Sequence, residues 1–313
     1  MKNGVKEVKI LEREFVVIVI GGGHAGIEAT LAVANRGMRV GLITEHFKSI
    51  GHMPCNPSIG GSAKGIVVRE ISALGGTMSE LADQSLLQIK MLNQSKGPAV
   101  WSLRAQIDTK VYSDLARETL EKHEFVTLVE GRVDELEIAN DLIIGVRLLT
   151  DEFIAAKAVI VTAGTYMNSS ILMGHKKTQG GPNGYKTSKS LSDSFGALGF
   201  DMFRLKTGTP ARIRKGSIDY SKTEIQPGDT IDWSFSVKEN ATTTHIAELP
   251  CYLTYAEAAT IEVIQENLQE SAMYSGNVEG VGPRYCPSIE DKVVRFSDKE
   301  RHQIFIEPIT LSN

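Results

Sequence analysis

The sequence predicts an α/β fold built around a parallel sheet. Phe15–Ile20 is a continuous apolar, β-branched run, typical of a strand that is buried on both faces of a parallel sheet. The glycine-rich stretch 21–26 interrupts it, and the segment up to Arg36 then carries Ala and Leu on one side, as a helix does. Residues 38–43 form a second apolar run. This strand–loop–helix–strand order is that of a Rossmann-like domain.

The following elements extend this unit. Gly37 ends the first helix, and residues 109–123 have the spacing of an amphipathic helix. From 125 to 164 the pattern is strand-like, with a turn signal at Asn140 and Asp141 and a return over Leu142–Leu148. Residues 158–163 (AVIVTA) form another buried strand, which ends at Gly164.

The second half of the chain has weaker signals. Residues 176–189 are polar, contain GGPNG and are predicted as a loop, and residues 255–271 are predicted as a helix with apolar positions at 258, 261, 264 and 268. Residues 204–250 have weak periodicity, so we place a domain border there. We expect a charged leader at 1–14, a Rossmann-like domain at 15–205, an inserted α/β domain at 206–303 and a divergent tail at 304–313.

Composition excludes several classes. The 313 residues are 42% apolar and 23% charged, which is ordinary for a soluble globular protein. No signal peptide and no apolar run long enough to span a membrane is visible, and we expect a cytoplasmic location. The three cysteines have no zinc-like spacing, and Cys251 lies in a strand-like run that favours the core. The net charge of −4 gives no overall attraction to nucleic acid.

Local basic charge is confined to one cluster. Arg204, Lys206, Arg212, Arg214 and Lys215 form the only dense group of cations. This group is compatible either with contact to RNA phosphates or with a solvated basic loop.

The stretch 21–26 (GGGHAG) matches G-x-G-x-x-G. Glycines there allow a tight turn, close approach of the backbone to a pyrophosphate, and close packing of helix on strand. The helix that follows offers free N–H groups to phosphate. The candidate binding residues are Gly21, Gly22, Gly23, His24, Ala25 and Gly26, and Glu45 at the end of the second strand is the candidate for a ribose hydroxyl. The glycine-ended run 158–164 favours FAD as the dinucleotide.

Four further segments stand out. They are 55–61 (CNPSIGG) with its continuation SAKG, 92–104 (LNQSKGPAVWSLR), 206–212 (KTGTPAR) and 282–296 (GPRYCPSIEDKVVRF). In the first, glycines at 60, 61 and 65 are expected to let the backbone approach a flat ligand, and Lys64 supplies a cation near a helix start. In the last, Glu290 and Asp291 are read as an exposed, ion-paired face.

Together with GGGHAG, these segments resemble the MnmG (GidA) family of tRNA-modifying flavoproteins, in order from about residue 15 to 307. The resemblance implies an FAD-dependent enzyme that adds a carboxymethylaminomethyl group at C5 of the wobble uridine of tRNA. It also implies NADH as reductant, methylene-tetrahydrofolate as carbon donor, an MnmE-like GTPase as partner, and a homodimer.

The resemblance also assigns residues. Residues 21–26 would hold the FAD pyrophosphate, and Val133 and Ser188 align with other FAD contacts. The nicotinamide-binding stretch would be Gly282, Pro283, Arg284, Tyr285, Cys286, Pro287, Ser288, Ile289, Glu290, Asp291, Lys292, Val293, Val294, Arg295 and Phe296. Cys55 and Cys286 match the two cysteines tied to activity, and no metal site is implied.

The chemistry of these residues agrees with that reaction. Uracil needs activation at C5, and a thiolate that adds at C6 makes C5 nucleophilic. Flavin would handle hydride transfer. Which of the two cysteines attacks stays open.

The chain is about half as long as members of that family, so the predicted domain is incomplete at its C-terminus, with an open sheet edge. Two other functions therefore stay in view. One is a truncated, non-catalytic homologue that binds FAD or a partner only. The other is a general FAD/NAD(P)H oxidoreductase.

Overall fold

The computed structural model describes residues 14–231, 233–238, 248–276, 280, 282 and 287–311. The predicted leader at 1–14 lies outside this part of the chain except for Glu14. Among the described residues, no helix is both long and apolar enough to cross a membrane.

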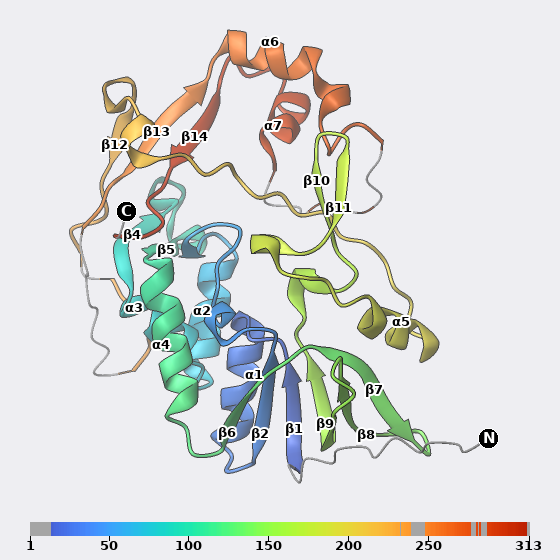
Figure 1. Ribbon diagram of the computed structural model, residues 1–313. Helices are drawn as coiled ribbons and strands as arrows, with labels where there is room; N and C mark the ends of the chain where they lie inside the picture. Colours follow the sequence, from blue (N-terminus) through green and yellow to red (C-terminus); the bar gives the residue numbers. More distant parts are fainter. Residues whose placement is uncertain are drawn as a thin grey trace.

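A six-stranded sheet forms the lower half of the molecule in Figure 1, with strand order β6-β2-β1-β9-β8-β7. Its strands are β1 (Phe15–Ile20), β2 (Val40–Thr44), β6 (Val126–Glu130), β7 (Val133–Ala139), β8 (Leu142–Leu148) and β9 (Phe153–Val161). The four strands from β6 to β9 run parallel, whereas β9, β8 and β7 pair antiparallel. The predicted α/β fold with a parallel sheet is confirmed.

Strand β1 is covered on both faces, which explains its continuous apolar sequence. Val17 and Val19 pack into one core cluster together with Leu31 of α1 (His24–Ala34). Ile18 and Ile20 pack into a second cluster on the opposite face, with Leu191 of α5 (Lys189–Ala197). The predicted first helix is therefore confirmed, and it ends one turn before Gly37.

The β7–β8 hairpin has the turn that the sequence predicts. Asn140 and Asp141 both have positive φ, 51° and 60°. Two consecutive positive φ angles are those of a type I′ turn, which matches the twist of the flanking strands. After the hairpin, the start of β9 pairs with β8 and its remainder with β1, so β9 joins the hairpin to the parallel strands.

A second layer packs on α1. It contains the antiparallel sheet β3-β5-β4 and three helices. The bounds are β3 Ser58–Gly60, β4 Leu86–Leu92, β5 Ser102–Ile107, α2 Lys64–Ala73, α3 Met78–Asp83 and α4 Thr109–Glu121. Ile59, Leu103 and Ala105 turn one face of this sheet into the first core cluster. Helix α4 confirms the helix predicted at 109–123.

The upper part of Figure 1 holds the sheet β12-β13-β14 with two helices, and the hairpin β10–β11. The bounds are β10 Ser170–Met173, β11 Lys176–Gln179, β12 Glu224–Gln226, β13 Cys251–Ala256, β14 His302–Ile306, α6 Ala258–Glu266 and α7 Ile289–Arg295.

Two predictions in this half are wrong. Residues 176–189 are not one loop, because they contain β11; this strand is exposed and polar, and backbone pairing with β10 holds it. The helix predicted at 255–271 is shorter. Tyr255 and Ala256 belong to β13, where they pair with Gln303 and His302 of β14.

The border expected between 303 and 304 falls inside β14. Beyond this strand, Thr310 Oγ1 and Leu311 N donate to Asp108 Oδ2 at 2.9 and 2.8 Å. Residues 304–311 are therefore bound to the rest of the fold at the start of α4.

Candidate dinucleotide site

The loop 21–26 runs from the carboxyl end of β1 into the first turn of α1. Gly21 has φ +106°, and its N–H donates to Ile43 O at 2.8 Å. A Cβ atom on Gly26 would lie 1.8 Å from Gly21 O. The tight turn and the close packing of helix on strand therefore require glycine at both ends of the loop.

Gly23 differs, because no atom of the described residues lies within 4 Å of where its Cβ would be. It is the N-cap of α1, with φ −74° and ψ −176°, and no side chain caps the helix start. The open surface at Gly23 and the amides of the first turn together form a cradle that a phosphate can fill.

Threonine 162 closes the loop from the neighbouring strand. Its hydroxyl donates to Ile20 O at 2.8 Å and to Gly21 O at 3.0 Å. Sequence reasoning did not single it out, although its place directly after the apolar run AVIV put it at the same sheet edge.

The ring of His24 contacts Tyr112 of α4. Its Nδ1 lies 3.2 Å from the hydroxyl of Tyr112, and the two rings meet edge to face. Burial of the imidazole, and then the charge of Lys64, lower the pKa of His24 to about 4. The imidazole is therefore neutral near pH 7 and adds no charge to a bound phosphate.

The other predicted FAD contacts lie at the same edge of the sheet. Glu45 follows β2, and its carboxylate lies 3.7 Å from Arg132 Nη1. Gly131 N donates to Thr44 O at 2.8 Å, which brings the start of β7, with the buried Val133, next to the end of β2. Ligands of open α/β sheets bind at this carboxyl edge.

Ser188 is held by a backbone hydrogen bond to Tyr166. Its N–H donates to Tyr166 O at 2.9 Å. The ring of Tyr166 lies 6.5 Å from that of Tyr185, centroid to centroid, and burial raises the pKa of Tyr166. Tyr185 also lies 5.3 Å from the ring of His46, centroid to centroid. No pattern in the sequence predicts this group of aromatic rings.

Two of the unusual segments meet at Cys55. Its Sγ donates to Gly208 O at 3.4 Å, and Arg212 Nη2 donates to Cys55 O at 2.7 Å. The segment 206–212 therefore lies directly on 55–61. Lys64 Nζ donates to Ser58 O at 3.0 Å, and burial lowers the pKa of Lys64.

The glycines at 60 and 65 were expected to leave room for a ligand, but the structure shows that they are needed for packing. A Cβ on Gly60 would lie 2.1 Å from Leu103 O, and one on Gly65 would lie 2.7 Å from the same atom. The chain itself fills the space beside them. Only Gly61, with φ +105° and nothing within 4 Å, leaves room for a ligand.

The predicted nicotinamide stretch is described at Gly282 and from Pro287 to Phe296; Pro283, Arg284, Tyr285 and Cys286 lie outside the described residues. Ser288 and Asp291 form a capping box at the start of α7, and Asp291 also accepts from Tyr274 OH at 2.9 Å. Asp291 is thus a half-buried capping residue rather than part of an exposed face. Helix α7 packs against α6 and β14.

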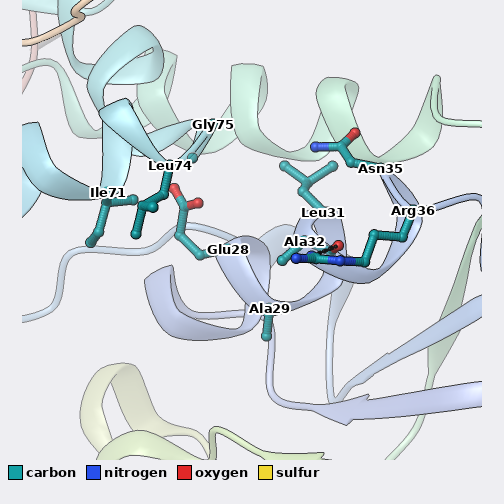
Figure 2. Close-up of a pocket in the computed structure, with 10 residues that line it drawn as sticks. Glu28, Ala29, Leu31, Ala32, Asn35, Arg36, Ile71, Leu74 and Gly75 are labelled. Atoms are coloured by element: carbon teal, nitrogen blue, oxygen red, sulfur yellow. Dashed lines mark hydrogen bonds between the residues drawn. The ribbon is translucent and has the colours of Figure 1, made fainter.

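A hollow of about 490 Å³ lies between α1 and the turn from α2 to α3 (Figure 2). There Glu28 accepts from Thr77 N and Met78 N at the start of α3, and burial raises the pKa of Glu28. None of the predicted site residues lines it, so we place the candidate site at the glycine loop.

Comparisons with known proteins agree with this geometry. The model of the family described as Glucose inhibited division protein A matches residues 16–313. A tRNA uridine 5-carboxymethylaminomethyl modification enzyme MnmG from Mycoplasmopsis synoviae is 53% identical over 301 residues, which are 96% of this chain and 49% of that protein. The enzyme of the same name from Onion yellows phytoplasma is 54% identical over 295 residues, 94% of this chain and 47% of its own length.

The solved structure of Aquifex aeolicus GidA in its form I crystal superposes with a TM-score of 0.89 at 46% identity. The match covers 96% of this chain and 51% of that one. The chain thus spans about half the length of the curated relatives and of the solved structure.

Proposed function

The chain belongs to the glucose inhibited division protein A (GidA) family, and from this membership we propose that it is the FAD-binding region of an enzyme that modifies wobble uridine in tRNA. The modification would be a carboxymethylaminomethyl group at C5, as the names of the relatives state for those proteins. The observation that carries the proposal is the open cradle at Gly23 in a chain that aligns over 96% of its length with such an enzyme.

The residues present fit FAD. Gly21, Gly23 and the first amides of α1 would hold the pyrophosphate, because Gly23 presents no side chain and no residue caps the helix. Glu45 would accept from a ribose hydroxyl, and Val133 and Ser188 would contribute further contacts. When bound, flavin supplies hydride transfer to or from a one-carbon unit.

Of the two cysteines that the structure describes, Cys55 and Cys251, Cys55 is the candidate nucleophile. In the proposed step its thiolate forms a bond to C6 of uracil, and the electron pair of the C5–C6 double bond moves towards the C4 carbonyl, which makes C5 nucleophilic. Arg212 Nη2 donates to Cys55 O at 2.7 Å and to Pro54 O at 3.2 Å, and so holds the backbone at Cys55. Cys286 is the second candidate for this role.

The remaining components are part of the same proposal. They are NADH bound by the segment 282–296, methylene-tetrahydrofolate as carbon donor, an MnmE-like GTPase, tRNA as substrate, a homodimer and a cytoplasmic location.

A chimera tests the function despite the difference in length. This chain would replace the matching half of the Mycoplasmopsis synoviae relative, in a bacterial strain that lacks its own MnmG. We expect mass spectrometry of digested tRNA to show restored carboxymethylaminomethyluridine, and a loss of at least tenfold in the Cys55→Ser chimera. A folded, flavin-containing chimera that produces no modified uridine would refute the proposal.

A further inference from the structure

Two cations lie side by side on the β3-β5-β4 sheet. Lys90 of β4 and Arg104 of β5 are register partners in an antiparallel pair. Side chains of directly opposed residues project from the same face about 5 Å apart, and like charges in that position destabilise a sheet. A local conflict of this kind in an otherwise consistent fold indicates a functional constraint.

Only one of these two cations has an acidic partner within the described residues. Arg104 forms an ion pair with Glu307, which β14 brings onto the sheet. Lys90 has no acidic partner within ion-pair distance in the part of the chain that the structure describes; its Nζ donates to Pro227 O at 3.4 Å. Two cations and one carboxylate leave one positive charge, in a chain whose net charge is −4.

A cavity of about 190 Å³ lies over the pair. Gln88, Lys90 and Arg104 line it from the β4–β5 side, and Cys251, Phe305 and Glu307 line it from the β13–β14 side. A water molecule occupies about 30 Å³ of liquid, so the cavity has room for a small ion and some of its hydration. From the unpaired charge and this cavity, we propose that it binds a small oxyanion, a carboxylate or a phosphate group.

The side chain of Gln88 is already hydrogen-bonded within the protein, so Lys90 and Arg104 are the residues that would bind the oxyanion. The amide of Gln88 donates to Gln226 O at 2.8 Å, and its oxygen accepts from Cys251 Sγ at 3.5 Å. Arg104 uses Nη2 for Glu307 and for Ser58 Oγ, and no bond of its Nε or Nη1 occurs within the described residues. An oxyanion bound there would accept from Lys90 Nζ and from the outer edge of the guanidinium.

Thermal unfolding measures this binding without flavin or tRNA, so its failure would be distinct from failure of the proposed function. The purified chain is heated in sodium acetate, sodium phosphate or sodium chloride at one ionic strength. The variant is Lys90→Met, which keeps the length and the apolar stem and relieves the repulsion with Arg104. Lys96→Met, at an exposed position outside the cavity, is the matched control.

We expect acetate or phosphate to raise Tm above its value in chloride for the wild type and for Lys96→Met, and this gain to vanish in Lys90→Met. A gain with acetate alone assigns the site to carboxylates, and a gain with phosphate alone assigns it to phosphate groups. An equal gain in Lys90→Met, or no gain over chloride in the wild type, overturns the proposal. Titration of the Arg104 Nε–Hε signal by NMR gives the same answer on the wild type if the variant fails to fold.

Discussion

Gly23 and Gly26 belong to the same motif but serve different purposes. At Gly26 the carbonyl of Gly21 leaves no room for a methyl group, whereas the position of a Cβ on Gly23 is open. The spacing of glycines in the sequence predicts the motif, but only the structure separates the glycine that the chain needs from the one that leaves space for a ligand. The same distinction corrects the expectation for Gly60 and Gly65.

His24 makes stability depend on pH. Its pKa of about 4 in the folded chain lies below the usual 6.5, so between these values the unfolded chain binds more protons. Stability therefore rises with pH across this window and falls as the pH drops from 6.5 towards 4. Over this window, His24 lowers the free energy of unfolding by up to about 3 kcal/mol as the pH falls.

We expect a His24→Asn variant to lose less stability than the wild type between pH 7 and pH 5, as measured by urea unfolding at both values. Equal losses in the two proteins would show that His24 titrates normally. An NMR titration of the imidazole gives its pKa directly.

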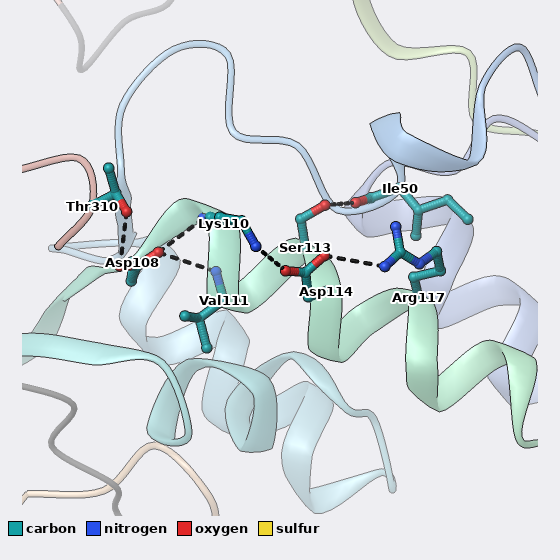
Figure 3. A network of polar contacts seen from close by, with 8 residues as sticks. All are labelled: Ile50, Asp108, Lys110, Val111, Ser113, Asp114, Arg117 and Thr310. Atoms are coloured by element: carbon teal, nitrogen blue, oxygen red, sulfur yellow. Dashed lines mark hydrogen bonds and ion pairs between the residues drawn. The ribbon is translucent and has the colours of Figure 1, made fainter. Parts of the chain in front are cut away.

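Among the elements, helix α4 is tied to the end of the described chain through its N-cap residue. Asp108 is its N-cap: Oδ1 accepts from Lys110 N and Val111 N, both at 3.0 Å, as Figure 3 shows. The other oxygen accepts from Thr310 and Leu311. One carboxylate thus starts the helix and anchors the last described residues.

We therefore expect Asp108→Ala to lower the free energy of unfolding by more than the loss of an ordinary N-cap does. Loss of the cap costs about 1 kcal/mol, and loss of the two hydrogen bonds from Thr310 and Leu311 adds about 1–3 kcal/mol. The measurement is the midpoint of chemical unfolding. Asp114→Ala is the control: its exposed carboxylate pairs with Lys110 and Arg117 on the surface of α4, and its removal should change the midpoint little. Equal effects of the two changes would contradict this account.

Elements with strong local patterns were predictable, and elements held by distant partners were not. The run at Phe15–Ile20 and the turn at Asn140 and Asp141 have local physical causes, and both are confirmed. Strand β11 has no buried face and no signal within its own sequence, because only backbone pairing with β10 holds it. The strand-like run at Cys251 is confirmed as the start of β13, but the extension of that strand to Tyr255 and Ala256 depends on β14, almost fifty residues later.

At the scale of the whole molecule, the fold collects residues that the sequence could only list. The loop 21–26 and Glu45 meet because parallel strands end at one edge, which the strand–loop–helix–strand pattern predicts. The start of β7 joins them because it follows the end of β6 after two residues. The contact of Arg212 with Cys55 and that of Glu307 with Arg104 join segments more than 150 residues apart. No spacing rule reaches over such distances.

In the proposed function, the cradle at Gly23 holds the pyrophosphate of FAD. Gly23→Ala tests this binding, because the backbone angles of Gly23 suit alanine and, within the described part of the chain, no atom opposes its methyl group. Gly196→Ala is the matched control, in α5 and equally free of neighbours. The measurement is titration of the purified chains with FAD, followed by visible absorption.

We expect Gly196→Ala to bind FAD like the wild type, and Gly23→Ala to fold normally but to bind FAD at least about tenfold more weakly, a loss of about 1.4 kcal/mol. Equal affinity of the two variants would contradict this expectation, and would place the dinucleotide away from the glycine loop.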